Sequence, residues 1–195
     1  MIESLNSFIE FIRDQIEDQT FILKINSNWG SDKPNYRVLI RHHLAEVDSS
    51  YFSRLQNAQL YDLNQRPQAI DGFISIAHCK NAGGFAYSTH PLGFDVEEVS
   101  RISDPILIRT STEIERSHAP HMKFLWVAKE AAYKALSDSS SESILITDLI
   151  CKNWLQTTDL QIWSYQIHSE KKINTIQNIG YVFSTPTLLL AIYFK

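Results

Sequence analysis

The N-terminal part of the chain repeats apolar side chains at a spacing that suits a helix. Over residues 4–18, apolar positions recur every three or four residues and form one stripe, which predicts an amphipathic helix. The short apolar run at residues 21–25 then predicts a strand. The sequence SDKP at residues 31–34 is a helix start signal, and we expect a second helix over residues 34–46.

The rest of the chain alternates between strand patterns and one long helical pattern. A helical pattern at residues 121–136 predicts the main helix. This order of helices, strands, a long helix and strands predicts an α+β fold with two lobes, residues 1–90 and residues 91–195. Runs that predict strands, bounded by turn residues, cover residues 72–77, 85–88, 92–99, 161–168 and 188–194.

Composition and charge narrow the classes of function. The chain has 195 residues, of which 44% are hydrophobic and 21% charged, as in ordinary globular proteins. A net charge of −4 argues against nucleic-acid binding, which needs a basic face to neutralise phosphates. The chain lacks an apolar run of about 18 residues and a signal-peptide pattern, so we expect a cytoplasmic protein with no membrane span. Cys79 and Cys151 form no CxxC motif and are expected to be free thiols.

The expected strand at residues 92–99 reads LGFDVEEV and carries acids among apolar residues. Alternate side chains of a strand share a face, so Gly93, Asp95 and Glu97 lie on one side. The two carboxylates are then about 6–7 Å apart along the strand and repel each other. A hard cation with oxygen ligands would relieve the repulsion. A solvent-facing strand, on which the acids are simply hydrated, explains the same pattern.

The long helical pattern holds a second pair of charged residues. Glu130 and Lys134 are four residues apart and lie on one helix face, with Trp126 one turn earlier. An exposed ion pair at this spacing contributes only about 0.3–0.5 kcal/mol. Taken by itself, this pair is better explained as an exposed ion pair on a solvated helix surface.

The strand and the helix together resemble the signature of the 4′-phosphopantetheinyl transferases. That signature is a strand reading G-[IF]-D-[IV]-E, followed further along by a helix reading W-x-x-K-E-A-x-x-K-A. Here the segments are GFDVE at residues 93–97 and WVAKEAAYKA at residues 126–135. Upstream, SIAH at residues 75–78 is similar to the S-x-S-H motif of the family, and Arg66 with Pro67 is similar to its basic residue and proline.

The resemblance implies an activity. Members of the family transfer the 4′-phosphopantetheine arm of coenzyme A to a serine of an apo carrier protein, acyl, polyketide or peptidyl, and release 3′,5′-ADP with the help of Mg²⁺. Glu130 would draw the proton from the serine, and Lys134 would offset the charge of the pyrophosphate. The implied site consists of the metal ligands Asp95, Glu97 and Glu130, the catalytic residues Glu130 and Lys134, and the coenzyme A-binding residues His78, Arg66 and Lys134.

The resemblance also implies an architecture. The chain length and the extra N-terminal half are similar to the surfactin-synthetase-activating type, in which two similar lobes form a pseudodimer in one chain, and such a chain is expected to work as a monomer. His78 would bind the 3′-phosphate of coenzyme A. A histidine satisfied at a strand end is the alternative, and the surrounding motif favours the phosphate-binding role. Lys33, Arg37 and Arg41 are spaced to share a helix face and could grip phosphates, but we favour an exposed face for them.

Two other functions stay open. SDSSSES at residues 137–143 replaces the G-x-G turn of the family, which leaves a coenzyme A- or nucleotide-binding homologue without transferase activity as an alternative. An interaction module in which both motifs arise by chance is the second alternative, and it would scatter Asp95, Glu97 and Glu130 over the molecule. Because carrier proteins are typically acidic, the basic residues within residues 100–123 predict the surface that meets the carrier.

Overall fold

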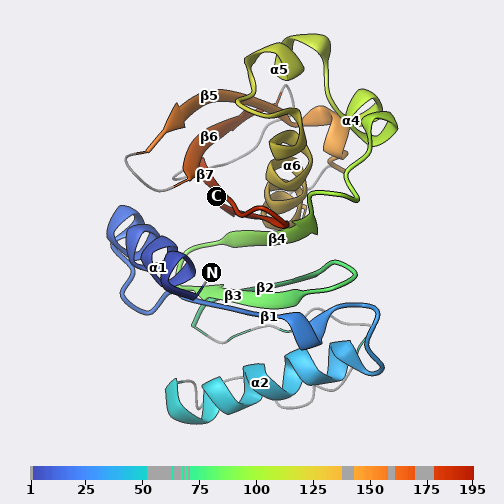
Figure 1. Ribbon diagram of the computed structural model, residues 1–195. Helices are drawn as coiled ribbons and strands as arrows, with labels where there is room; N and C mark the ends of the chain where they lie inside the picture. The colour runs from blue at the N-terminus through green and yellow to red at the C-terminus, as the bar shows by residue number, and fades with distance from the viewer. Residues whose placement is uncertain are drawn as a thin grey trace.

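The computed structural model describes residues 2–51, 63, 67, 69, 71–137, 143–157, 161–169 and 178–195 (Figure 1). Its α-helices are α1 (Ile2–Ile16), α2 (Tyr36–Tyr51), α4 (Asp104–Thr110), α5 (Glu113–His118) and α6 (Met122–Leu136). Its strands are β1 (Ile22–Asn26), β2 (Phe73–His78), β3 (Gly83–Ser88), β4 (Leu92–Glu98), β5 (Ile150–Gln156), β6 (Ile162–His168), β7 (Ile179–Ser184) and β8 (Leu188–Phe194). Short 3₁₀ turns lie at Ser27–Trp29 and Ile146–Asp148. The fold is α+β, as predicted, and none of the described helices is long and apolar enough to cross a membrane.

Two antiparallel sheets form the frame of the molecule. The first has the strand order β1-β3-β2, and the second has the order β4-β8-β7-β6-β5. The edge strands β2 and β4 lie side by side where the sheets meet. There Ser75 Oγ accepts a hydrogen bond of 2.9 Å from the backbone N–H of Phe94. A buried side-chain hydrogen bond therefore joins the sheets at a point where no backbone ladder does, and it orients β2 against β4.

The helices and sheets stack in layers (Figure 1). Helix α2 covers the outer face of the first sheet, where Ile40 and Phe85 belong to one buried cluster. A second cluster, with Leu23 and Ile192 among its members, fills the space between the two sheets. A third lies between the second sheet and α6, with Ala132 at its centre. Each large apolar side chain buried in these clusters contributes about 1.5–3 kcal/mol, so burial is what holds the layers together.

Helix α1 ties the N-terminal half of the chain to the second sheet. Its predicted apolar stripe faces inward, and Phe8 and Ile12 have no solvent exposure. The ring of Phe8 stacks on Phe183 with centroids 5.1 Å apart, and Phe11 meets Tyr181 edge-on at 5.4 Å. The two halves of the chain thus share one apolar core.

The apolar pattern located the long elements and missed several short ones. Helix α6 begins at Met122, one residue after the predicted start, whereas α2 continues to Tyr51, beyond the predicted end at residue 46. Strand β5 reads ICKNWLQ and lies at the sheet edge with four exposed residues, so its side chains do not alternate between apolar and polar. The short helix α5 is specified locally by a capping box between Thr112 and Glu115, which the apolar pattern does not reveal.

Candidate active site

Strand β4 and helix α6 approach each other very closely at Gly93. A Cβ atom on Gly93 would lie 1.9 Å from the carbonyl oxygen of Ala131, so any other residue would push the helix away. The side chains of a strand alternate, so Asp95 is on the same face of β4 as Gly93 and also points toward α6. The glycine of the signature thus brings the acids of β4 next to the helix that carries Glu130 and Lys134.

Lys134 is the direct link between the helix and the strand. Its Nζ lies 2.7 Å from Asp95 Oδ1 and also donates to the carbonyl oxygen of Phe94 over 3.1 Å. Asp95 is only 8% exposed, so its carboxylate needs a positive partner. The Lys134 side chain is 26% exposed and reaches this partner from the solvent side.

Glu97 and Glu130 face the same region as Asp95. Burial raises the pKa of Glu130, and the negative charges of Asp95 and Glu97 raise it further, while Lys134 lowers it. Burial also raises the pKa of Glu97. The backbone N–H of Glu98 and the charge of Arg101 lower it, and the charges of Asp95 and Glu98 raise it. The charges of Asp95 and Glu97 thus reach Glu130, which puts the three acids of the sequence signature in the same region between β4 and α6 without forming a cluster of ligands.

One oxygen of Asp95 and one oxygen of Glu97 are engaged within the protein. Asp95 Oδ1 accepts from Lys134, and Glu97 Oε1 accepts from the backbone N–H of Glu98 over 2.9 Å. Among the described residues, no three His, Cys, Asp or Glu side chains are close enough together to form a metal-binding group. Carboxylate oxygens are nevertheless the ligands that Mg²⁺ prefers, and a cation here would offset the smaller part of the rise in the glutamate pKa values that comes from neighbouring acids.

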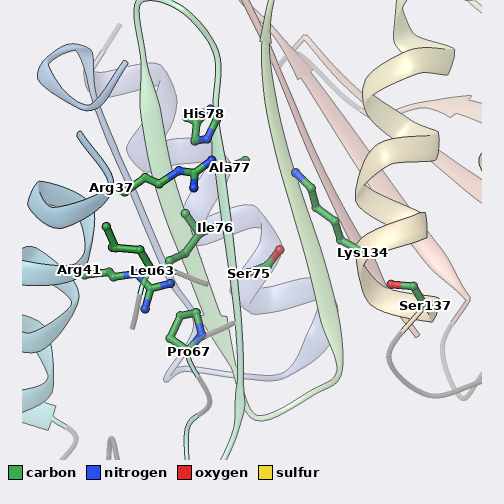
Figure 2. A pocket seen from close by; sticks show the side chains of 10 residues that line it. All are labelled: Arg37, Arg41, Leu63, Pro67, Ser75, Ile76, Ala77, His78, Lys134 and Ser137. Atoms are coloured by element: carbon green, nitrogen blue, oxygen red, sulfur yellow. The ribbon is translucent and has the colours of Figure 1, made fainter. Parts of the chain in front are cut away.

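A cavity of about 490 Å³ opens between α2, β2 and α6 (Figure 2). Basic side chains enter it from two sides, with Arg37 and Arg41 on α2 and Lys134 on α6. His78, the last residue of β2, also lines it. The remaining lining residues are Leu63, Pro67, Ser75, Ile76, Ala77 and Ser137. A cavity lined by two arginines, and by a lysine whose charge is partly offset by Asp95, is suited to a ligand that carries phosphates.

Arg41 corrects the expectation that the basic face of α2 is exposed. Arg41 is 7% exposed and lines the cavity, and Arg37, one turn earlier, lines the same cavity from an exposed position. Lys33 is exposed as expected, and its Nζ pairs with Asp32 over 3.0 Å. Four-residue spacing placed the arginines on one face, but the packing of α2 on the first sheet decided that Arg41 is buried there while Arg37 stays exposed.

His78 is held by an aromatic neighbour that the sequence did not indicate. Its Nε2 lies 3.1 Å from the hydroxyl oxygen of Tyr36, and the two rings meet edge-on with centroids 4.6 Å apart. Burial lowers the pKa of His78, and the positive charges of Arg37 and Lys134 lower it further. A hydrogen bond with its own backbone and the negative charge of Asp95 raise it. The ring is therefore neutral near pH 7.

Two features of the sequence signature fall outside the described residues. They are Arg66, expected to bind coenzyme A, and residues 138–142 of the segment that replaces the G-x-G turn. Pro67, the neighbour of Arg66, is buried and lines the cavity.

Comparison with known proteins gives no family assignment for this chain. No protein-family model matches the sequence. No curated protein matches it either. The function is therefore inferred from the chemistry of the site and from the sequence signature.

Proposed function

We propose that this protein transfers the 4′-phosphopantetheine group of coenzyme A to a serine of an apo carrier protein. The observation that carries the proposal is the position of Lys134. It pairs with Asp95, beside Glu97 and Glu130, and it also lines the basic cavity. A group of acids and a binding cavity for phosphates thus share one residue, which is what a phosphoryl-transfer site on a polyphosphate substrate requires.

The cavity provides partners for the charged part of coenzyme A. Coenzyme A carries a pyrophosphate and a 3′-phosphate, and all three phosphates are anionic. Arg37, Arg41 and Lys134 supply permanent positive charge, and guanidinium groups bind phosphate in a two-pronged manner. We assign Lys134 to the pyrophosphate, because it lies beside the acids, and the α2 arginines with His78 to the 3′-phosphate.

The acids then account for the reaction. The serine hydroxyl of the carrier attacks the phosphorus next to pantetheine, a new P–O bond forms, and the bond to 3′,5′-ADP breaks. Glu130 accepts the serine proton, a task for which a raised pKa is favourable. Asp95, Glu97 and Glu130 would hold Mg²⁺, which when bound stabilises negative charge on the phosphates. Lys134 offsets the charge that develops on the leaving phosphate.

The architecture is compatible with this proposal. Each of the two sheets has a helix on its outer face, α2 on the first and α6 on the second, and the inner faces pack together. The first sheet has three strands and the second has five, so the pseudodimer of two similar lobes rests on the sequence resemblance. The candidate site lies where the edge strands of the halves meet, so one chain supplies a complete site and we propose that it works as a monomer.

The decisive experiment is incubation with coenzyme A, Mg²⁺ and several purified apo carriers, followed by intact-mass measurement. A carrier that gains the mass of phosphopantetheine, while its serine-to-alanine variant does not, supports the proposal. No gain on fatty-acid, polyketide and peptide-synthetase carriers alike would count against transferase activity.

A coenzyme A-binding protein without transferase activity is the second candidate. The ion pair between Lys134 and Asp95 favours it, because this pair already neutralises one of the acids without a metal. Calorimetric titration of coenzyme A with Mg²⁺ and with a chelator separates the two. The transferase proposal expects much weaker binding with the chelator, whereas equal affinity in both supports the simple binding protein.

A further inference from the structure

Tyr36 opens helix α2 beside the cavity and contacts His78 at the end of β2. The contact joins residues 42 positions apart, so it exists only because α2 packs on the first sheet. The edge-on meeting of the rings places the Tyr36 hydroxyl at Nε2 of the imidazole. Asn35, with a φ angle of 59°, turns the chain into the helix immediately before Tyr36.

Arg37 favours one direction for this hydrogen bond. Its Nε donates to the Tyr36 hydroxyl oxygen over 3.1 Å, and its Cζ lies 5.7 Å from the centroid of the Tyr36 ring. A guanidinium group can only donate, so the hydroxyl oxygen is the acceptor in this contact. In the arrangement that uses the hydroxyl as acceptor for Arg37 and as donor for its other neighbour, the hydroxyl proton points to Nε2 of His78. An imidazole that accepts at Nε2 carries its own proton on Nδ1.

We propose that Tyr36 is a positioning residue of the cavity, which holds His78 as the neutral Nδ1–H tautomer and keeps Arg37 beside it for a phosphate group. The choice of coenzyme A as the ligand rests on the proposed function, whereas the tautomer of His78 does not. Tyr36 lies outside the sequence signature, and its role follows from the geometry of α2 and β2 alone.

The groups around His78 determine what loss of the hydroxyl does. Arg37 from α2, Lys134 from α6 and Asp95 from β4 act on its charge, and burial disfavours the charged ring. The Tyr36 hydroxyl also favours the neutral ring, because it donates to Nε2. Replacing Tyr36 with Phe removes that donor, so the pKa of His78 should rise and the two neutral tautomers should mix. Arg37 loses its acceptor as well, so affinity for coenzyme A should fall about fivefold, the effect of one typical hydrogen bond.

The experiment compares wild type with Tyr36→Phe and with the matched control Tyr87→Phe. The hydroxyl of Tyr87 donates to a backbone carbonyl outside this contact. Long-range ¹H–¹⁵N spectra of the imidazoles, recorded across a pH range without ligand, report the tautomer and pKa of His78, with His42 and His43 as internal references. Calorimetry then measures coenzyme A binding by all three proteins.

The expected result is an Nδ1–H tautomer in wild type and in Tyr87→Phe, and a tautomer mixture, a raised pKa and about fivefold weaker coenzyme A binding in Tyr36→Phe. In a transfer assay the Michaelis constant for coenzyme A should rise and the turnover number should hold. An Nε2–H tautomer in wild type, or a Tyr36→Phe spectrum equal to that of wild type, would overturn the inference. If wild type binds no coenzyme A, the proposed function is wrong, and the spectra still decide whether Tyr36 positions His78.

Discussion

Helix α6 carries two lysine–carboxylate pairs of nearly equal length in very different surroundings. Lys129 Nζ lies 2.8 Å from Glu115 Oε1, and these side chains are 1% and 2% exposed. Lys134 Nζ lies 2.7 Å from Asp95 Oδ1, and these side chains are 26% and 11% exposed. The distances are alike, so the role of each pair follows from its neighbours.

The buried pair is saturated with structural partners. Lys129 also donates to the carbonyl oxygen of Thr110, and Glu115 accepts from the backbone N–H groups of Thr112 and Cys151. These bonds fasten α4, α5 and β5 to α6. The pair at Lys134 instead borders a cavity and two glutamates with raised pKa values. Adjacent residues in one signature, Lys129 and Glu130, thus belong to a structural network and to a candidate reactive site.

Breaking the buried pair should have the largest effect. Lys129→Met leaves Glu115 buried and charged without a counterion, which should lower the free energy of unfolding by about 3–5 kcal/mol. Urea denaturation followed by circular dichroism measures the loss. Lys134→Met is the matched control on the same helix and should lose less than half as much, because Lys134 reaches water. An equal loss of unfolding free energy in the two variants would show that the two pairs do not differ in structural role.

Changes at the exposed pair should act on transfer. Lys134→Ala and Glu97→Gln should each keep a native circular dichroism spectrum and lose at least about a hundredfold in turnover, because each removes a charge from the reacting phosphates or their metal. Turnover is measured by carrier mass at saturating coenzyme A. Lys152→Ala, an exposed lysine on β5, removes the same charge elsewhere and should behave like wild type. Near-normal turnover in either site variant means that its residue has been assigned wrongly.

The two glutamates of the comparison should respond to neutralisation with opposite signs. The folded protein raises the pKa of Glu130 above its usual 4.5. The folded protein therefore keeps the Glu130 carboxyl protonated up to a higher pH than the unfolded chain does. As pH rises from 4.5 through the raised pKa, the free energy of unfolding falls. Glu130→Gln should therefore be more stable than wild type at pH 7, by less than about 1 kcal/mol, with the gain vanishing below pH 4.5.

Glu115→Gln, the matched control, should lose stability at pH 7, because Lys129 loses its partner. Denaturation curves at both pH values test these signs. Transfer by wild type should also decline as pH falls toward the raised pKa of Glu130, since the base must be ionised. A Glu130→Gln variant that is less stable at pH 7 would show that Glu130 has a structural role.

The smallest effect is expected on the surface that α4 and α5 present. Ile108 and Ile114 are 64% and 72% exposed there, next to the basic residues that we expect to meet an acidic carrier. Replacing Arg101 and Arg109 together by Ala should raise the Michaelis constant for the carrier a few-fold. The increase should be smaller at high salt, which screens the charges. The Michaelis constant for coenzyme A should not change. Arg37→Ala should show the reverse pattern. A double variant that weakens coenzyme A binding alone would place this segment in the nucleotide site.

Local periodicity in the sequence by itself determined much of this protein. A stripe at helical spacing predicted α1 and α6, and alternation placed Asp95 and Glu97 on one face of β4. A four-residue step placed Glu130 and Lys134 on one face of α6. These relations hold within a single helix or strand, where the geometry of the backbone alone fixes which side chains share a face.

Relations between elements were decided only by the tertiary structure. The packing of α2 on the first sheet buried Arg41 and brought Tyr36 to His78. The close approach at Gly93 set Lys134 against Asp95, and the docking of α5 buried Lys129 with Glu115, whereas Glu130 faces the region in which the charges of Asp95 and Glu97 act on it. Burial and charge pairing depend on which faces meet, and that is settled by the packing of distant segments into common apolar cores, which the period of one segment does not contain.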